Sequence, residues 1–327
     1  MKKITKYIPT IILTLLCSCS DYLDIVPDNV TTLDIVFNNR NTAERYLANC
    51  YHFVPDHGSV KRIPGMGAGH ECWFYTTNDS HFDNEVSFYI ARGLQNIDAP
   101  YANYWDGEGG SNLPMFRAIR ECNIFLDYVR DQHKVNDLTD SERKRWIAEV
   151  NVLKAYYHFF LFEHYGPIPI VDKALPVSTD PEGVKVTRMP VDQIVDYMVK
   201  LIDDSYKDLP PVITMEATEM GRLTQPAALA LKAKILLWAA SPLFNGNKDY
   251  ANFRNEEGKP FINQEFSREK WVRTAEACKE AIESADGLYR SFFATRKWKR
   301  SSNRQYFAKQ GSRCICSYTG NCRTILQ

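Results

Sequence analysis

Residues 69–110 hold the side chains whose types could bind a ligand. The segment reads GHECWFYTTNDSHFDNEVSFYI and then, after a short gap, DAPYANYWDGEGG, and it is rich in rings, amides and carboxylates. Sugars bind to aromatic faces through their C–H surfaces, while amides and carboxylates reach their hydroxyl groups. We therefore predict a partial sugar-binding surface here, made by Trp73, Tyr75, Asn78, Asp79 and Trp105. The alternative is that these rings only pack as loops against the rest of the protein.

Metal ligands are also concentrated in this part of the chain. Four histidines (His52, His57, His70 and His81) and two cysteines (Cys50 and Cys72) occur here, but their spacings match no zinc pattern. The stretch DSHFDNE offers three acidic residues without the glycine that an EF-hand loop needs, so it leaves open no more than a calcium contact. No metal site and no cofactor is predicted.

Carboxylates beside the rings raise the question of an enzyme. Asp106 and Glu108, or Asp83 and Glu85, could be the acid and the base of a glycosidase. Residues two apart on a loop are generic, however, and the sequence contains no hydrolase motif of the GxSxG or HExxH kind. No catalytic residue is predicted, and a surface glycoside hydrolase is the less favoured alternative.

The elements that position this segment are helices. Apolar periodicity near 3.6 residues predicts helices over these ranges: 41–54, 112–131, 140–165, 190–208, 224–241 and 268–286. Thr139 and Glu142 fit a capping box, while Pro190 and Pro226, with Thr224 as cap, suit helix starts. Strands are hard to find, which indicates a mainly all-α fold.

The stretch LKAYYHFFLFEHYGPIPIV, residues 153–171, predicts a helix that is buried on nearly every side. Apolar residues recur at steps of three and four along one face and also cover much of the remainder, as expected for a middle helix of a stacked array. His158 and His164 lie six residues apart, so they cannot share a metal as an i, i+4 pair does. The helix ends at Gly166-Pro167. The alanine-rich helix predicted over 224–241 allows close, tetratricopeptide-like packing.

The first residues are typical of an export signal. Three early lysines precede the short apolar run IPTIILTLL, and Cys19 follows Ser18 with Leu16 three positions back, which resembles a bacterial lipobox. We predict a signal peptide over 1–18 and lipid attachment at Cys19, with an ordinary secretory signal and a transmembrane anchor as alternatives.

Charge distribution argues against nucleic acid as a partner. Residues 20–289 carry 28 basic and 40 acidic side chains, and this acidic excess would repel a phosphate backbone.

Three motifs together resemble one family. SCSDYLDIVPDN, EVNVLKAYYHFFLFEHYGPIPIV and GRLTQPAALALKAKILLWAASPLFNG, in this order, are similar to the SusD/RagB family of surface lipoproteins, in its N-terminal part. The resemblance implies a tetratricopeptide-like array of helical hairpins with long irregular insertions, over residues 19–289. It also implies a non-catalytic protein, lipid-anchored at the cell outer membrane, that captures a glycan or other nutrient and covers a SusC-like TonB-dependent transporter.

The last residues depart from the family. Residues 290–327 contain nine basic side chains, three cysteines and no acidic side chain. We interpret them as an aberrant tail from a shifted reading frame, with a genuine basic arm as the alternative. On this interpretation the C-terminal half of the family fold, which supplies much of the ligand surface, is missing. A truncated helical scaffold that contacts only the transporter barrel is then the alternative function.

Overall fold

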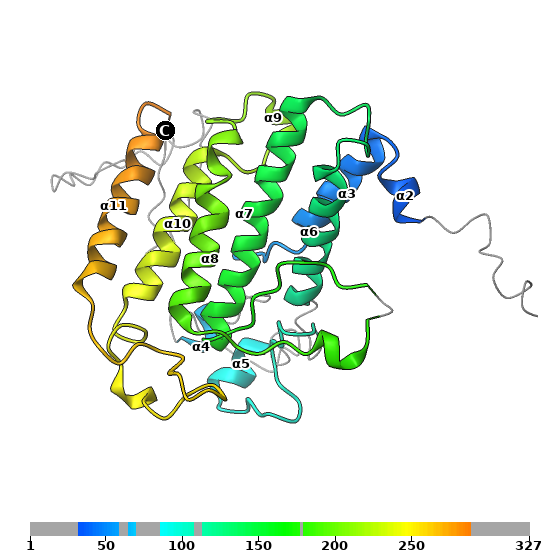
Figure 1. The fold of residues 1–327 in the computed structure, drawn as a ribbon. Helices are drawn as coiled ribbons and strands as arrows, with labels where there is room; N and C mark the ends of the chain where they lie inside the picture. Colours follow the sequence, from blue (N-terminus) through cyan, green and yellow to red (C-terminus); the bar gives the residue numbers. More distant parts are fainter. Residues whose placement is uncertain (1–31, 59–64, 70–85, 108–112, 177–178, 289–327) are drawn as a thin grey trace, which may run out of the picture.

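The computed structural model describes residues 32–58, 65–69, 86–107, 113–176 and 179–288 (Figure 1). This part of the chain is mainly helical, and its β-structure is limited to two isolated bridges, Asn245 with Asn263 and Arg254 with Pro260. Within the same ranges, no helix has both the length and the apolar character needed to cross a bilayer. The predicted all-α, tetratricopeptide-like fold is confirmed.

Long helices form a single layered array. They are α3 (Arg40–His52), α6 (Met115–Arg130), α7 (Asp140–Tyr165), α8 (Val191–Asp203), α10 (Gln225–Ala240) and α11 (Arg268–Ala285). Across the molecule they follow this same order, each packed beside the next (Figure 1). Antiparallel neighbours that follow one another in sequence are what a stack of helical hairpins requires.

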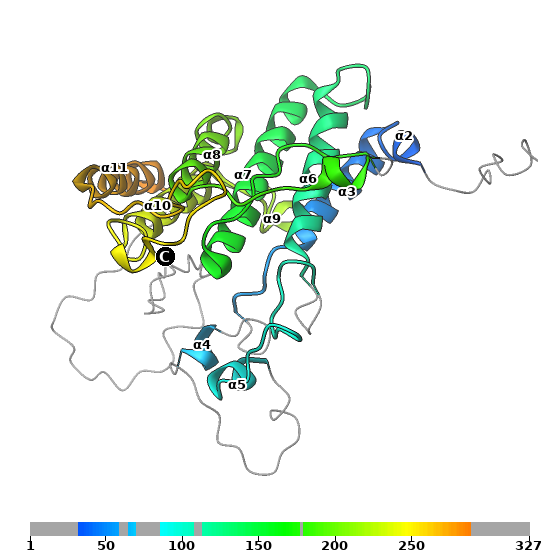
Figure 2. The ribbon, with the colours of Figure 1, turned by 60° about the horizontal axis from the view of Figure 1, so that its bottom comes forward.

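Short elements fill the connections. They are α2 (Leu33–Val36), α4 (Gly65–Ala68), α5 (Val86–Ala91), α9 (Glu216–Glu219) and the 3-10 turns Pro181–Val184, Tyr206–Asp208 and Lys248–Tyr250. Figure 2 shows α4 and α5 outside the layer of long helices. These two short helices of the insertion between α3 and α6 therefore project from the array.

Predicted helix boundaries agree closely with the structure. The helix predicted over 140–165 has these bounds, and Thr139 and Glu142 form the expected capping box, in which each side chain bonds the other's backbone N–H. The helix predicted over 190–208 ends earlier, at Asp203, because the chain tightens into the separate turn Tyr206–Asp208. Pro190 is the N-cap of α8, and Thr224 is the N-cap of α10 without a capping hydrogen bond from its side chain.

Helix α7 is buried on nearly every side, as predicted. An unbroken run from Ala148 to Ala155 is buried, and the rings of Tyr157, Phe159 and Phe160 extend the core toward the end of the helix. The exception is His164, which the sequence places on the apolar face but which is exposed in the last turn. The buried polar side chains of α7 must therefore find partners inside the protein.

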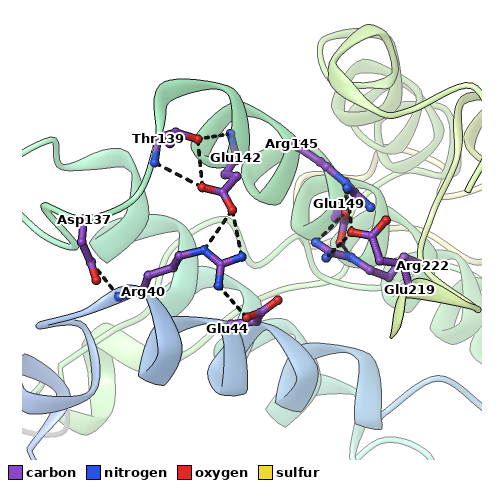
Figure 3. Close-up of polar contacts among 9 residues, drawn as sticks. All are labelled: Arg40, Glu44, Asp137, Thr139, Glu142, Arg145, Glu149, Glu219 and Arg222. Atoms are coloured by element: carbon purple, nitrogen blue, oxygen red, sulfur yellow. Dashed lines mark hydrogen bonds and ion pairs between the residues drawn. The ribbon is translucent and has the colours of Figure 1, made fainter. Parts of the chain in front are cut away.

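Glu149 is the most demanding of these polar side chains, since it is an acidic residue that is 0% exposed. Figure 3 shows its carboxylate beside Arg145 and Arg222. Its carboxylate accepts hydrogen bonds from Arg145 (2.9 Å), Arg222 (3.1 Å) and the hydroxyl of Tyr51 (2.8 Å). Glu219, in α9, accepts from the same two arginines. This ionic network joins α3, α7 and the segment around α9 through one buried charge.

At the far edge of the array, α11 is much less covered. It packs chiefly on α10 and buries only Thr274 and Ala277 within its length. Trp271, Val272 and Ile282 remain exposed. Ion pairs add to its attachment to α8, from Lys270 to Asp192 and from Arg273 to Asp196.

Replacing Glu149 by Gln should lower the free energy of unfolding by about 3 kcal/mol, because the two arginines would keep their charges without the buried carboxylate. Urea unfolding followed by circular dichroism measures this loss. Glu44→Gln is the matched control, since Glu44 pairs with Arg40 at a partly exposed position. This substitution should lower the free energy of unfolding by less than about 1 kcal/mol. Equal effects of the two substitutions would contradict the structural role of the buried network.

Candidate ligand-binding site

The loop of residues 101–107 is tied to the end of α7. The backbone N–H of Tyr104 donates to the hydroxyl of Tyr165 (2.9 Å), and its carbonyl accepts from the N–H of Met115 (3.0 Å). The ring of Tyr104 is 1% exposed and packs edge-on against Phe160 and His164, both at 4.8 Å between centroids. The loop is thus fixed between the last turn of α7 and the first turn of α6.

The turn within the loop of residues 101–107 is also fixed by local contacts. The side chain of Asn103 accepts from the N–H of Trp105 (3.1 Å) and donates to the carboxylate of Asp106 (2.7 Å). Gly107 has φ of 91°, and a side chain there would meet Pro114 at 2.8 Å. These local constraints fix the orientation of Trp105 through contacts within the protein alone.

Trp105 is partly buried and has three neighbours around its ring. Phe116 and Tyr165 meet it edge-to-face, at 4.7 Å and 5.4 Å. The guanidinium of Arg188 lies 5.4 Å from its centroid, in a cation–π contact. Arg188 is itself anchored, because it donates to the carbonyls of Tyr165 and Pro167. Trp105 is therefore a rigid aromatic group that keeps part of its surface open, although the prediction that it contacts a ligand stays a prediction.

Two further rings lie in the same insertion and were not singled out from the sequence. Tyr89 and Tyr101 stack at 4.9 Å with an angle of 12° between their planes, and both are partly exposed. The only sequence signal for them was the general enrichment of this segment in aromatic residues. Together with Trp105 they give the insertion three partly exposed rings in its described portion.

The other predicted site residues lie outside the residues that the structure describes. These are Trp73, Tyr75, Asn78, Asp79 and the lipid-attachment residue Cys19. The signal peptide 1–18, the tail 290–327 and the carboxylates of Asp83, Glu85 and Glu108 also lie outside them. Of the carboxylates considered for catalysis, Asp106 is described, and it accepts the hydrogen bond from Asn103.

A second polar cluster was missed from the sequence, on the buried side of α7. Nδ1 of His158 donates to the carbonyl of Lys154 (2.8 Å), which leaves Nε2 to accept from the N–H of Val171 (3.3 Å). The ammonium of Lys154 donates to both the carboxylate (2.8 Å) and the carbonyl (2.9 Å) of Asp172. These two side chains hold the extended segment that follows Gly166 against the array.

Burial also decides the charge of this cluster. It lowers the pKa of His158 from 6.5 to about 4, so the imidazole is neutral at pH 7, as its two hydrogen bonds require. Burial lowers the pKa of Lys154 as well, against the opposing effect of Asp172. The cluster is therefore a structural anchor whose stability depends on pH.

Two shallow hollows lie elsewhere, along α8, α10 and α11. Their volumes are about 190 Å³ and 330 Å³, and both are lined by Leu236 and Arg273. Several charged side chains around them pair across the helices, as Lys232 does with Asp203 and Glu280. Neither hollow is lined by the rings of the insertion.

Comparison with known protein families identifies the chain. The family model SusD-like_3, described as "Starch-binding associating with outer membrane", matches residues 21–237. The chain belongs to this SusD-like family, which agrees with the resemblance that its motifs show.

Solved structures share this fold. BT4246 is 30% identical, with a TM-score of 0.61, over 76% of this chain and 40% of that one. A SusD-like protein from Bacteroides fragilis (BF3747) shares the fold at 16% identity and a TM-score of 0.52, over 82% of this chain and 41% of that one. A SusD superfamily protein from Parabacteroides distasonis does so at 17% identity and a TM-score of 0.51, over 77% and 46%.

The chain thus spans less than half the length of these solved relatives. Among curated proteins, none matches the chain.

Acid should weaken the fold through His158. The unfolded chain takes up a proton on this imidazole below pH 6.5, whereas the folded protein does so only near pH 4. The stabilisation is therefore present above pH 6.5 and is lost as the pH falls toward 4, by about 3 kcal/mol.

His158→Gln should flatten this dependence in urea unfolding measured between neutral pH and about pH 4.5. The matched control is His133→Gln, since His133 is an exposed histidine in the loop after α6. If the wild type and His158→Gln lost stability in parallel, His158 would not be the responsible group.

Proposed function

We propose that this chain is the N-terminal part of a cell-surface lipoprotein that captures a glycan or other nutrient and passes it to a SusC-like TonB-dependent outer-membrane transporter. The observation that carries the proposal is the position of Trp105, a fixed and partly exposed ring on an insertion of a SusD-like array. A rigid ring loses little conformational entropy when a sugar stacks on it. The array itself supplies the scaffold and, on this proposal, the contact with the transporter.

The anchor in this proposal is a lipid on Cys19. Several acyl chains on one cysteine would hold the protein stably at the membrane surface. The protein acts by binding and has no catalytic residue in this proposal, in keeping with the non-catalytic role that the resemblance implies.

A scaffold that contacts only the transporter is the second candidate. It is favoured by the shallow hollows of the described array, around which charged side chains such as Lys232 already form ion pairs. The two candidates differ in one measurable property, because the scaffold would bind the transporter and retain no glycan.

Affinity gel electrophoresis of the full chain with a panel of polysaccharides, starch included, tests ligand capture. Trp105→Ala should weaken retention about tenfold, as expected from the loss of one ring stacked on a sugar. Trp271→Ala is the matched control, since Trp271 is an exposed tryptophan on α11 at the other edge of the array. Equal retention of the two folded variants would reject the role of Trp105, and retention by no polysaccharide would favour the scaffold.

Lipid attachment is tested by the intact mass of the protein extracted from membranes. The mature chain should begin at Cys19 and carry the mass of the attached lipid, whereas Cys19→Ala should lose both the lipid and the membrane association. A mature protein with an earlier or later N-terminus and no added mass would overturn this part of the proposal.

A further inference from the structure

Two cysteines far apart in sequence meet in the core between α3 and α6. Cys50 lies on the buried stripe of α3 with Ala43 and Leu47, and Cys122 lies on the buried stripe of α6. Both are 0% exposed, and their thiols lie within hydrogen-bonding reach of each other. In the structure both are free thiols.

The surroundings favour a reaction between the two sulfurs over metal binding. No group of three or more metal-ligating side chains occurs in the described portion of the chain, so this pair lacks the further ligands that a zinc site needs. The hydroxyl of Tyr157 donates to the backbone carbonyl of Cys50, which ties this turn of α3 to α7. The helices that carry the two sulfurs are thus already held together by other contacts.

We propose that Cys50 and Cys122 form a disulfide bond in the exported protein, which links α3 to α6. The proposal rests on the export that is part of the proposed function, because disulfides form and persist in oxidising compartments. The two thiols lie within hydrogen-bonding reach of each other, and bond formation further requires that the Cα separation and the Cβ directions of the two residues suit a disulfide.

The oxidant is a thiol–disulfide oxidoreductase in its disulfide form. The thiolate of one cysteine attacks the oxidant's disulfide, which gives a mixed disulfide and releases one thiolate of the oxidant. The thiolate of the second cysteine then attacks the mixed disulfide at the sulfur of the first and releases the other thiolate. Two electrons pass to the oxidant, and the two protons lost by the cysteines end on its two thiols.

The order of events follows from burial. Burial raises the pKa of the Cys122 thiol well above its usual value, so the reactive thiolate is scarce in the closed fold. Oxidation therefore takes place while α3 is still apart from α6, during folding or local opening. Once closed, the same burial shields the disulfide from external reductants.

The bond would matter for the candidate site because of where it lies in the sequence. Residues 50 and 122 bracket the insertion that carries the predicted ligand-binding residues, from Trp73 to Trp105. A disulfide at its base would close the whole insertion into a loop, and closing a long loop restricts the unfolded chain strongly.

Peptide mapping of the full chain, exported in a bacterium and blocked with N-ethylmaleimide without reductant, tests the proposal. The expected result is a peptide pair joined through Cys50 and Cys122, which separates on reduction. Recovery of both residues with the maleimide label would overturn it. Cys278, on the partly exposed α11, is the internal control and should be labelled.

A second arm does not depend on export. The full chain, reduced and unfolded, is refolded in a glutathione redox buffer, and it should form the same pair and melt on the order of 10 °C above its reduced form. Cys50→Ala/Cys122→Ala should show no such difference, while Cys278→Ala should keep it. Refolded protein in which Cys50 and Cys122 are not joined would contradict the proposed disulfide.

The mass of the N-terminal peptide distinguishes the disulfide proposal from the proposal that the chain is exported and lipid-anchored. Lipid on Cys19 together with labelled Cys50 and Cys122 would overturn the disulfide while export stands. A chain that keeps its signal peptide and joins Cys50 to Cys122 only in the refolding buffer would support the proposed pairing. The same result would count against export.

Discussion

The burial of α7 on nearly every side is the constraint on which the rest of the structure depends. The buried polar side chains of such a helix cannot reach water, so each of them needs a hydrogen-bond partner inside the protein. Glu149 reaches Tyr51 of α3 and Arg222 beyond α9, while Lys154 and His158 reach the extended segment after Gly166. The contacts that satisfy α7 are therefore the same contacts that set the positions of its neighbours. Even the candidate site depends on this helix, since the loop with Trp105 is bonded to Tyr165, the last residue of α7.

Most of the fold could be predicted from the sequence, because the signals for helices are local. Apolar spacing, the Thr139–Glu142 capping box and the Gly166-Pro167 stop together define α7 to the residue. Contacts between residues far apart in the sequence leave no such local signal. Nothing in the periodicity shows that Glu149 meets Arg222, 73 residues away, or that Arg188 covers the ring of Trp105. For the same reason the composition of the insertion suggested Trp105, whereas its fixed orientation came only from the structure. Trp73, Tyr75, Asn78 and Asp79 stay predictions.

The same architecture determines which segments of the chain remain accessible for ligand contacts. The inner helices, α7 above all, have most of their surface committed to the array, so the proposed ligand contacts fall to the segments between helices. The insertion between α3 and α6 is the longest of these in the first half of the chain, and it carries Tyr89, Tyr101 and Trp105. Ring-rich loops on a rigid support can change their specificity without disturbing the support.

The weak coverage of α11 has a consequence for how the array opens. In a stack of hairpins each unit is stabilised mainly by its neighbours, so an inner unit has two interfaces and an outer unit has one. Helix α11 buries little more than Thr274 and Ala277, while α7 is enclosed. Thermal fraying should therefore start at α11 and move inward, and its backbone amides should exchange with solvent sooner than those of α7. Along this order of helices, opening reaches the buried charge of Glu149 on α7 only after α11, α10 and α8 have separated.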